Sequence, residues 1–335
     1  MRRLTLLSFL AFASAAHAHG QSGLTLPAVP LRPGVTADIH LEVHEAAAPC
    51  EGAVVLAVHG VAHAAASWQP FAERVVEEGL AGLTVCKVLA VDLPGRGGSS
   101  LPAGGPKFGY LTLPDYVAVL RGVLDRLPAA GLQPDTLIGH SQGGLLIQLA
   151  QKALVAEGSS LHGLGITKAV LLASVGPRQV PWEFVDGGTA MPILTRYIRF
   201  NRTRGLHVSV PDAAWPTLFF SDLLGAVVGA PAPAEVARYN ARESVVSSLQ
   251  LVGRLGFRRP TVPAGVFSPS RGTHLTVIAL DQDTIIRPHE NTLLYEHLTG
   301  QPAGGAVIVV SGATTVHDMH VADPGGLLAA VPGLP

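Results

Sequence analysis

The stretch that most constrains the fold is residues 136–144, which read TLIGHSQGG. Its first half is an apolar run typical of a buried strand, and a helix is predicted directly after it, over residues 145–156. A strand that passes into a helix this abruptly needs a very sharp turn. Gly139 and Gly143 suit the turn, because a Cβ atom at either position would collide with the crossing chain. Ser141 would then stand clear of the backbone at a helix N-terminus, where free N–H groups favour negative charge.

The rest of the chain alternates between strand and helix patterns. Continuous apolar runs such as 53–59 are typical of parallel strands covered on both faces. Residues 35–45 alternate apolar and polar, which predicts a half-buried edge strand, and the Pro-rich segment 19–33 is predicted to be irregular. Further strands are predicted at 88–92, 169–175, 273–280 and 306–311, and further helices at 69–79, 114–127 and 288–298. This order predicts an α/β fold with a mostly parallel central sheet and helices on both faces.

Between residues 176 and 271 the pattern changes. Prolines and aromatic residues are frequent there and no strand alternation is clear, so we expect a mainly helical insertion that caps the site. The fold core would then consist of two parts, residues 19–175 and 272–335. We expect the cap aromatics to pack in the cap's own core rather than against a substrate: Trp182, Phe184, Tyr197, Phe200, Trp215, Phe219 and Phe220.

Residues 1–18 are typical of a cleaved signal peptide. Two arginines near the start, an apolar run over residues 4–16 and Ala-His-Ala at 16–18 predict export, with the mature chain beginning at His19. We expect a periplasmic or extracellular protein with no stable membrane insertion, since no later segment predicts a transmembrane helix. The net charge of −1 gives no electrostatic reason to expect nucleic-acid binding. The oligomeric state stays open.

The two cysteines are predicted to form a disulfide. Cys50 lies just before the strand at 53–59, and Cys86 lies at the start of the following strand. If these strands are parallel neighbours, both cysteines lie at the same end of the sheet, within reach of each other. An exported protein meets an oxidising environment, which favours the disulfide over the alternative of two buried free thiols.

Five segments, in this order, resemble the α/β-hydrolase-fold serine hydrolases: HGVAHAAASW, DLPGRGGSS, GHSQGG, ALDQDTIIRP and VHDMHVADP. They fall within residues 35–175 and 273–328, and the cap contributes nothing to the resemblance. It implies the α/β-hydrolase fold, with the Gly-x-Ser-x-Gly turn as a nucleophile elbow and the catalytic triad in the chain order Ser, acid, His.

By this resemblance, Ser141 is the nucleophile. A Ser hydroxyl needs a general base, and the base needs an acid that holds its tautomer. His317 matches the family's spacing for the base, with His320, one turn further, as the fallback. Asp283, shortly before an apolar pair and a proline, matches the pattern for the acid, with Asp281 as the fallback.

The oxyanion hole is expected to consist of two backbone N–H groups. One belongs to Gln142, the residue after the nucleophile, and the resemblance assigns the other to Val61. His59 and His140 are expected to shape these turns.

The pairs His59 with His63 and His317 with His320 could imitate metal ligands, but neither has the additional ligands that a site needs. We therefore expect no metal and no cofactor. The glycines at 95–98 lack the Lys-Ser/Thr of a phosphate-binding loop and indicate a structural turn.

A Ser at the elbow, rather than the Asp of dehalogenases and epoxide hydrolases, favours acyl transfer. We expect an exported carboxylic-ester hydrolase that acts on an uncharged small-molecule or lipid-like ester. Amide, peptide, lactone or thioester cleavage, or perhydrolysis, by the same triad are the alternatives, because specificity lies in the cap and loops. A non-catalytic binding protein that keeps the fold is a more distant one.

Overall fold

A computed structural model describes residues 20–47, 49–80, 82–105, 107–254, 256–304 and 307–330. The predicted signal segment and its cleavage site lie outside the described residues. Among the helices described, none has the length and apolar character needed to cross a membrane.

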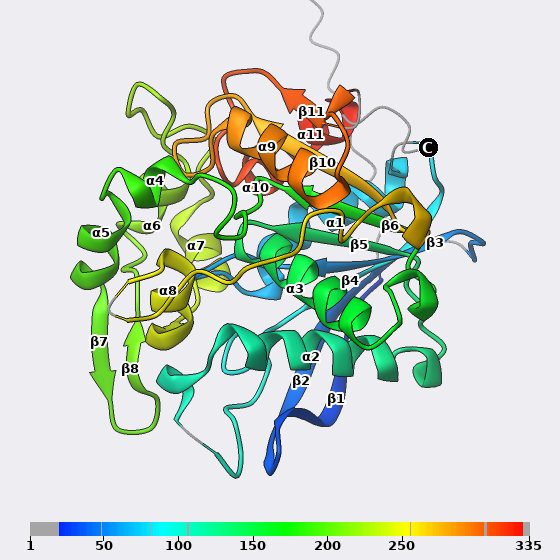
Figure 1. Cartoon of the computed structure of the whole chain (residues 1–335), viewed down its shortest axis with the longest axis horizontal. Coiled ribbons are helices and arrows are strands. Elements are labelled where there is room, and N and C mark those ends of the chain that lie inside the picture. The colour runs from blue at the N-terminus through cyan, green and yellow to red at the C-terminus, as the bar shows by residue number, and fades with distance from the viewer. Residues whose placement is uncertain are drawn as a thin grey trace, which may run out of the picture.

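One central sheet of eight strands organises the fold, in the order β1-β2-β4-β3-β5-β6-β10-β11 (Figure 1). Strands β1 and β2 are antiparallel to each other, β2 is antiparallel to β4, and the remaining neighbours are parallel. This confirms the predicted mostly parallel α/β sheet. The strands are β1 (Gly20–Arg32), β2 (Val35–Glu45), β3 (Ala53–Val58), β4 (Val85–Val91), β5 (Thr136–His140), β6 (Lys168–Leu172), β10 (His274–Leu280) and β11 (Val307–Val310).

The N-terminal strand corrects two expectations. Residues 20–32, predicted to be irregular, form β1, and β2 is consequently the second strand of the sheet rather than its edge. Prolines argued against a strand here because they cannot donate to the ladder, but an edge strand tolerates them. The pairing register shifts between Leu26 and Val29 and again after Pro30. The prolines therefore lie at local irregularities of the ladder, and the strand continues past them.

Helices cover both faces of the sheet, as predicted (Figure 1). Because side chains alternate along a strand, Leu56 and Val58 of β3 enter one hydrophobic cluster while Val55 and Ala57 enter the other. The first cluster also contains side chains of α2, α3 and α9, the second contains side chains of α1 and α11, and α10 contributes to both. These helices are α1 (Gln69–Glu78), α2 (Leu113–Arg126), α3 (Gln142–Ala156), α9 (Pro288–Thr299), α10 (Met319–Ala322) and α11 (Pro324–Ala330).

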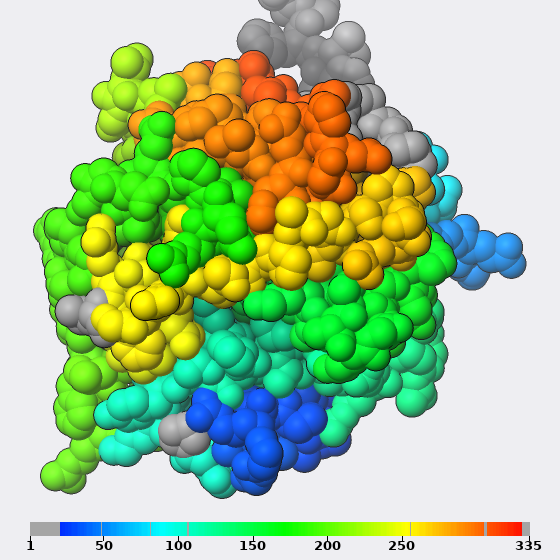
Figure 2. Space-filling model, viewed as in Figure 1, coloured from blue at the N-terminus to red at the C-terminus, as the bar shows by residue number. Residues whose placement is uncertain are grey.

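The segment expected to form the cap holds short helices and a small sheet that the sequence analysis missed. Strands β7 (Ile198–Asn201), β8 (Gly205–Val208) and β9 (Glu243–Ser244) pair in an antiparallel sheet, too short to show a period-two pattern. The helices are α4 (Glu183–Asp186), α5 (Ala190–Arg196), α6 (Trp215–Phe219), α7 (Pro233–Tyr239) and α8 (Val245–Val252). In Figure 2 the green and yellow surface of this segment is continuous with the orange surface of the second core part.

A buried ion pair ties this segment to the core. Arg96, in the turn after β4, pairs with Glu243 of β9, and neither side chain is exposed to solvent. Glu243 also accepts hydrogen bonds from Tyr116 of α2 at 3.0 Å and from Ser247 of α8 at 2.7 Å. A buried charge is tolerated only when it is paired and hydrogen-bonded in this way. Asp92 shapes the same turn by accepting the Gly98 N–H at 2.9 Å.

The structure confirms the predicted disulfide. Strands β3 and β4 are parallel neighbours, and Cys50 and Cys86 are joined with their Cα atoms 5.5 Å apart. The bond links residues 36 apart in the sequence and so restricts the unfolded chain.

Replacing both cysteines with serine (Cys50→Ser with Cys86→Ser) should lower the free energy of unfolding by about 3–4 kcal/mol, the loop-closure entropy of a loop of this size. Urea unfolding of the double variant and of the oxidised wild type measures this difference. The reduced wild type serves as the control and should match the variant. Equal stability of all three samples would contradict the prediction.

Candidate active site

The turn between β5 and α3 holds Ser141 in a strained conformation. Its φ and ψ angles are 52° and −116°, a region that non-glycine residues rarely adopt. A Cβ atom on Gly143 would lie 2.2 Å from the Val58 carbonyl oxygen, and one on Gly139 would lie 2.6 Å from the Gly144 nitrogen. The glycines are therefore required for the close crossing that the sequence analysis expected, and this crossing presents Ser141 at the start of α3.

His317 and Asp283 meet at the carboxyl ends of neighbouring strands. Asp283 follows β10, His317 follows β11, and the His317 Nδ1 atom donates to Asp283 Oδ2 at 2.8 Å. The other carboxylate oxygen accepts the N–H groups of Ile285 and Ile286 at 2.7 and 2.9 Å, which fixes its orientation. Burial alone would lower the pKa of His317, but the charge and hydrogen bond of Asp283 outweigh it, so the pKa lies above its ordinary value.

The two fallback residues have other surroundings. Asp281 accepts a hydrogen bond from Thr315 and, within the described residues, makes none to His317. His320 is fully buried, and its ring lies 4.6 Å from that of Trp68 and 4.5 Å from that of His140, measured between centroids. Neither of its nitrogens has a hydrogen-bond partner among the described residues.

The loop after β3 passes directly beside Ser141. A Cβ atom on Gly60 would lie 3.1 Å from the Ser141 Cβ, so the next residue, Val61, lies close to Ser141. In the part of the chain that the structure describes, the backbone N–H groups of Val61 and Gln142 donate to no other residue. Both are therefore available to a bound oxygen. His59 shapes this loop, since its Nε2 accepts the Leu93 N–H at 3.3 Å.

A cavity of about 90 Å³ opens onto Ser141 and His317. Apart from these two residues and Ser248, its lining is almost entirely apolar and comes from both the core and the cap segment. The expectation for the cap aromatics is therefore only partly correct. Trp215 and Phe220 are buried in packing and Phe200 is exposed, but four of the seven line the cavity: Trp182, Phe184, Tyr197 and Phe219.

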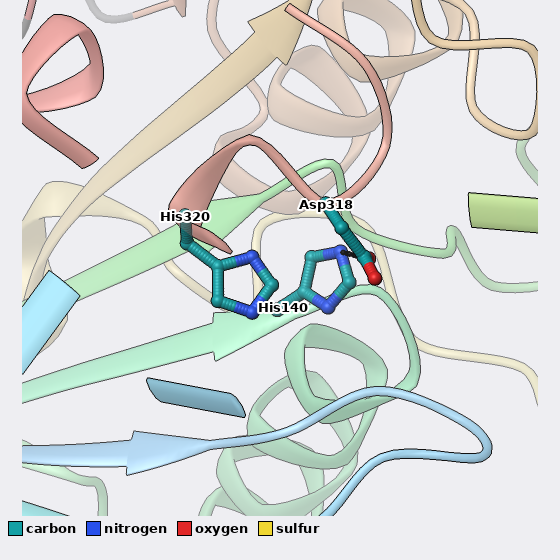
Figure 3. A group of neighbouring side chains, drawn as sticks. All are labelled: His140, Asp318 and His320. Carbon is teal, nitrogen blue, oxygen red and sulfur yellow. Dashed lines mark ion pairs between the residues drawn. The ribbon is translucent and has the colours of Figure 1, made fainter. Parts of the chain in front are cut away.

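Behind the cavity lies a buried cluster of polar side chains, three of which are drawn in Figure 3: His140, Asp318 and His320. His140 lies between the other two, with its Nε2 atom 3.4 Å from Asp318 Oδ1 and 3.0 Å from the His317 carbonyl oxygen. The fourth member, His63, contacts Asp318 Oδ2 through Nε2 at 2.6 Å. Asp318 was not among the site residues predicted from the sequence, where its only signal is the position next to His317.

The donor atoms of His140, Asp318 and His320 lie within 4.8 Å of one another, a spacing that could hold a metal ion. A metal ligand must offer a lone pair, and two of these three residues already make other contacts. The His140 Nε2 atom near Asp318 already donates its proton to the His317 carbonyl, and Asp318 is already paired with His63. A second group, Glu183, His289 and Glu290, is largely exposed.

The sequence profile of the alpha/beta hydrolase family matches residues 54–331, most of the chain. This chain belongs to the alpha/beta hydrolase family. The hydrolase is similar in fold to naproxen esterase (carboxylesterase NP) from Bacillus subtilis, at 14% identity and a TM-score of 0.59, over 94% of this chain and 91% of that one.

The hydrolase is also similar to the thioesterase domain from the curacin biosynthetic pathway, at 17% identity and a TM-score of 0.54, over 94% of this chain and 99% of that one. A thermophilic esterase from Thermogutta terrifontis shows 16% identity and a TM-score of 0.51, over 92% and 96% of the two chains. No curated protein matches the sequence at a significant level. At such low sequence identities, these structural similarities show that the fold is shared and no more.

Gly143→Ala should destabilise the hydrolase by about 3 kcal/mol or more, because the added Cβ meets a backbone oxygen that cannot move without shifting β3. Gly325→Ala in α11 is the matched control. Its Cβ would have only ordinary contacts, 3.7 Å from Arg74, so stability should stay equal or rise slightly. Thermal unfolding of both variants measures the difference. A Gly143→Ala variant as stable as Gly325→Ala would contradict this account of the turn.

Proposed function

We propose that this hydrolase cleaves carboxylic esters through a Ser-His-Asp triad of Ser141, His317 and Asp283. The observation that carries the proposal is the buried 2.8 Å hydrogen bond between His317 and Asp283, beside a cavity that both His317 and Ser141 line. Nucleophile, base and orienting acid come from three loops at the carboxyl ends of β5, β11 and β10, where α/β sheets place their sites.

In the proposed reaction, the Ser141 hydroxyl attacks the ester carbonyl while His317 Nε2 takes its proton. Asp283 holds the proton on Nδ1, which leaves Nε2 free as the base, and its charge stabilises the imidazolium that forms. The N–H groups of Val61 and Gln142 donate to the oxyanion. His317 then protonates the leaving alkoxide, and water activated by the same residue releases the acid from Ser141.

The cavity supports an uncharged substrate with an apolar group. No Asp, Glu, Lys or Arg side chain among the described residues lines the cavity, so a charged acyl group would lose its hydration without gaining a partner of opposite charge. Its volume of about 90 Å³ favours a compact group over a long chain unless the cap moves. An esterase and a thioesterase domain share this fold, and thioester, amide and lactone cleavage and perhydrolysis therefore stay as the second candidates.

We also propose that the protein is exported. The signal-like segment at residues 1–18 supports this, and so does the Cys50–Cys86 disulfide, because such bonds persist in oxidising compartments.

The mature wild type should hydrolyse p-nitrophenyl esters, with the highest kcat/KM at short acyl chains because the cavity is small. Ser141→Ala should lose at least about 10³-fold in kcat, as removal of an activated nucleophile does. Covalent labelling with a fluorophosphonate, followed by mass spectrometry, locates the nucleophile independently of substrate choice. Wild type that is neither active nor labelled at Ser141 would refute the proposed function and favour a binding protein.

The rate should depend on the protonation of His317. The base acts only when neutral, so kcat/KM should be full above the pKa of His317 and fall as pH drops through it, at a pH above the ordinary histidine value of about 6.5. Asp283→Asn removes the cause that raises this pKa. The acid limb of the pH–rate profile, where kcat/KM falls, should therefore move to lower pH, and the rate should fall by about 10⁴-fold.

Asp281→Asn is the matched control for Asp283→Asn. Its carboxylate contacts Thr315 and not His317, so the limb should stay in place and the rate should change by less than about tenfold. The opposite result, with Asp281→Asn shifting the limb and Asp283→Asn leaving it, would assign the acid to Asp281.

A further inference from the structure

We infer that His63 and Asp318 form a buried ion pair that positions the active site, holding the loop of the oxyanion donor Val61 against the loop of the base His317. This inference rests on the proposed function. His63 is two residues after Val61, and Asp318 is the residue after His317. One contact therefore joins the two loops that must act together on the substrate carbonyl.

Hydrogen bonding determines the charge of His63. Its Nε2 atom lies 2.6 Å from Asp318 Oδ2, and its Nδ1 atom lies 2.6 Å from the Val61 carbonyl oxygen. A carboxylate and a carbonyl can only accept, so both ring nitrogens must carry protons. His63 is therefore an imidazolium. Burial opposes the charge of Asp318, but His63 lowers the pKa of Asp318 below its ordinary value, and the pair is fully charged.

The pair holds a strained backbone segment in place. Ala62, between Val61 and His63, has a φ of 59°, a conformation that is costly for a residue with a Cβ. The His63 side chain fixes the Val61 carbonyl on one side of it. The Ala62 carbonyl accepts the Trp215 Nε1–H at 3.3 Å on the other. This strain would relax without the contacts, and the Val61 N–H would turn away from the oxyanion.

Asp318 also acts on the base loop. Its backbone N–H donates to the Phe219 carbonyl at 3.3 Å, and its second carboxylate oxygen faces His140, which donates to the His317 carbonyl. Burial, above all, lowers the pKa of His140 well below its ordinary value, so His140 is a neutral donor that adds no charge. The backbone of His317 is thereby held from both sides.

The cap segment keeps water away from this pair. The rings of Trp215 and Phe219 lie 4.9 and 4.7 Å from the His63 ring, and the His63 side chain is only 1% exposed. Exclusion of water strengthens the ion pair. His63 and Asp318 touch no reacting atom, so both are positioning residues.

The test uses Asp318→Asn and His63→Gln, which keep the side-chain shape but remove the charge. Each should lower kcat by about 10–100-fold with KM changed less than about threefold, because a small displacement of oxyanion donor and base affects the transition state most. Affinity for a trifluoromethyl ketone, which forms the tetrahedral adduct, should fall with kcat/KM. The double variant should be no slower than the worse single one, since both lose the same contact.

His289→Gln is the matched control. It breaks another His–carboxylate pair, with Glu183 at 3.1 Å, which is more than half exposed, and kcat should stay within about twofold. ¹⁵N NMR of histidine-labelled wild type gives a readout that does not need activity. The resonances that disappear in His63→Gln should show two protonated ring nitrogens in the folded wild type, as the two hydrogen bonds require. If Asp318→Asn does not fold, His63→Gln and the NMR measurement decide the question.

Three results would overturn the inference: kcat within twofold of wild type in both variants, a His63 ring with only one protonated nitrogen in the NMR spectrum, or one equivalent of zinc in elemental analysis of the wild type. Failure of the proposed function is separate. In that case fluorophosphonate would leave Ser141 unlabelled in the wild type, whereas failure of this inference leaves wild-type labelling intact.

Discussion

The close crossing of α3 over the end of β3 is the constraint on which the site depends. With no Cβ on Gly143, the start of α3 comes within contact of the Val58 carbonyl, and only then can Ser141 take up its strained turn. The same crossing places the loop of Val61, the second residue after His59, beside Ser141. The strain at Ser141 and at Ala62 persists because the flanking strands and helices are buried on all sides.

Buried charge is the second organising element. The Arg96–Glu243 pair ties the cap segment to the turn after β4, and the His63–Asp318 pair ties two loops of the site together. A buried pair adds little net stability over an apolar contact, but breaking it by removing one partner is costly. Such pairs therefore specify one arrangement of loops more than they strengthen the fold. In a hydrolase that uses an oxyanion hole, catalysis requires such an arrangement of loops, since the oxyanion donors must already point at the position of developing charge.

Much of the core fold could be predicted from the sequence. The other strands of the central sheet and the helices α1, α2, α3 and α9 were predicted because apolar periodicity reports burial directly, whereas the short helices α10 and α11 were not predicted. The disulfide followed from the position of each cysteine next to adjacent strands. Strand β1 was missed because its prolines are compatible with a strand only at a sheet edge, and the cap strands were missed because two to four residues carry no periodic signal. Only the structure showed which cap aromatics pack in the protein interior and which line the cavity.

The sequence by itself determined the α/β fold, the turn at Ser141 and the short set of candidate catalytic residues. These properties depend on local pattern: hydrophobic period, glycine at a crossing, and motif order. Only the tertiary structure decided that Asp283 rather than Asp281 meets His317, and that His63 meets Asp318, 255 residues away. Contacts of this kind depend on where a side chain points at the end of its strand, to within a few ångströms, and no local pattern encodes that direction.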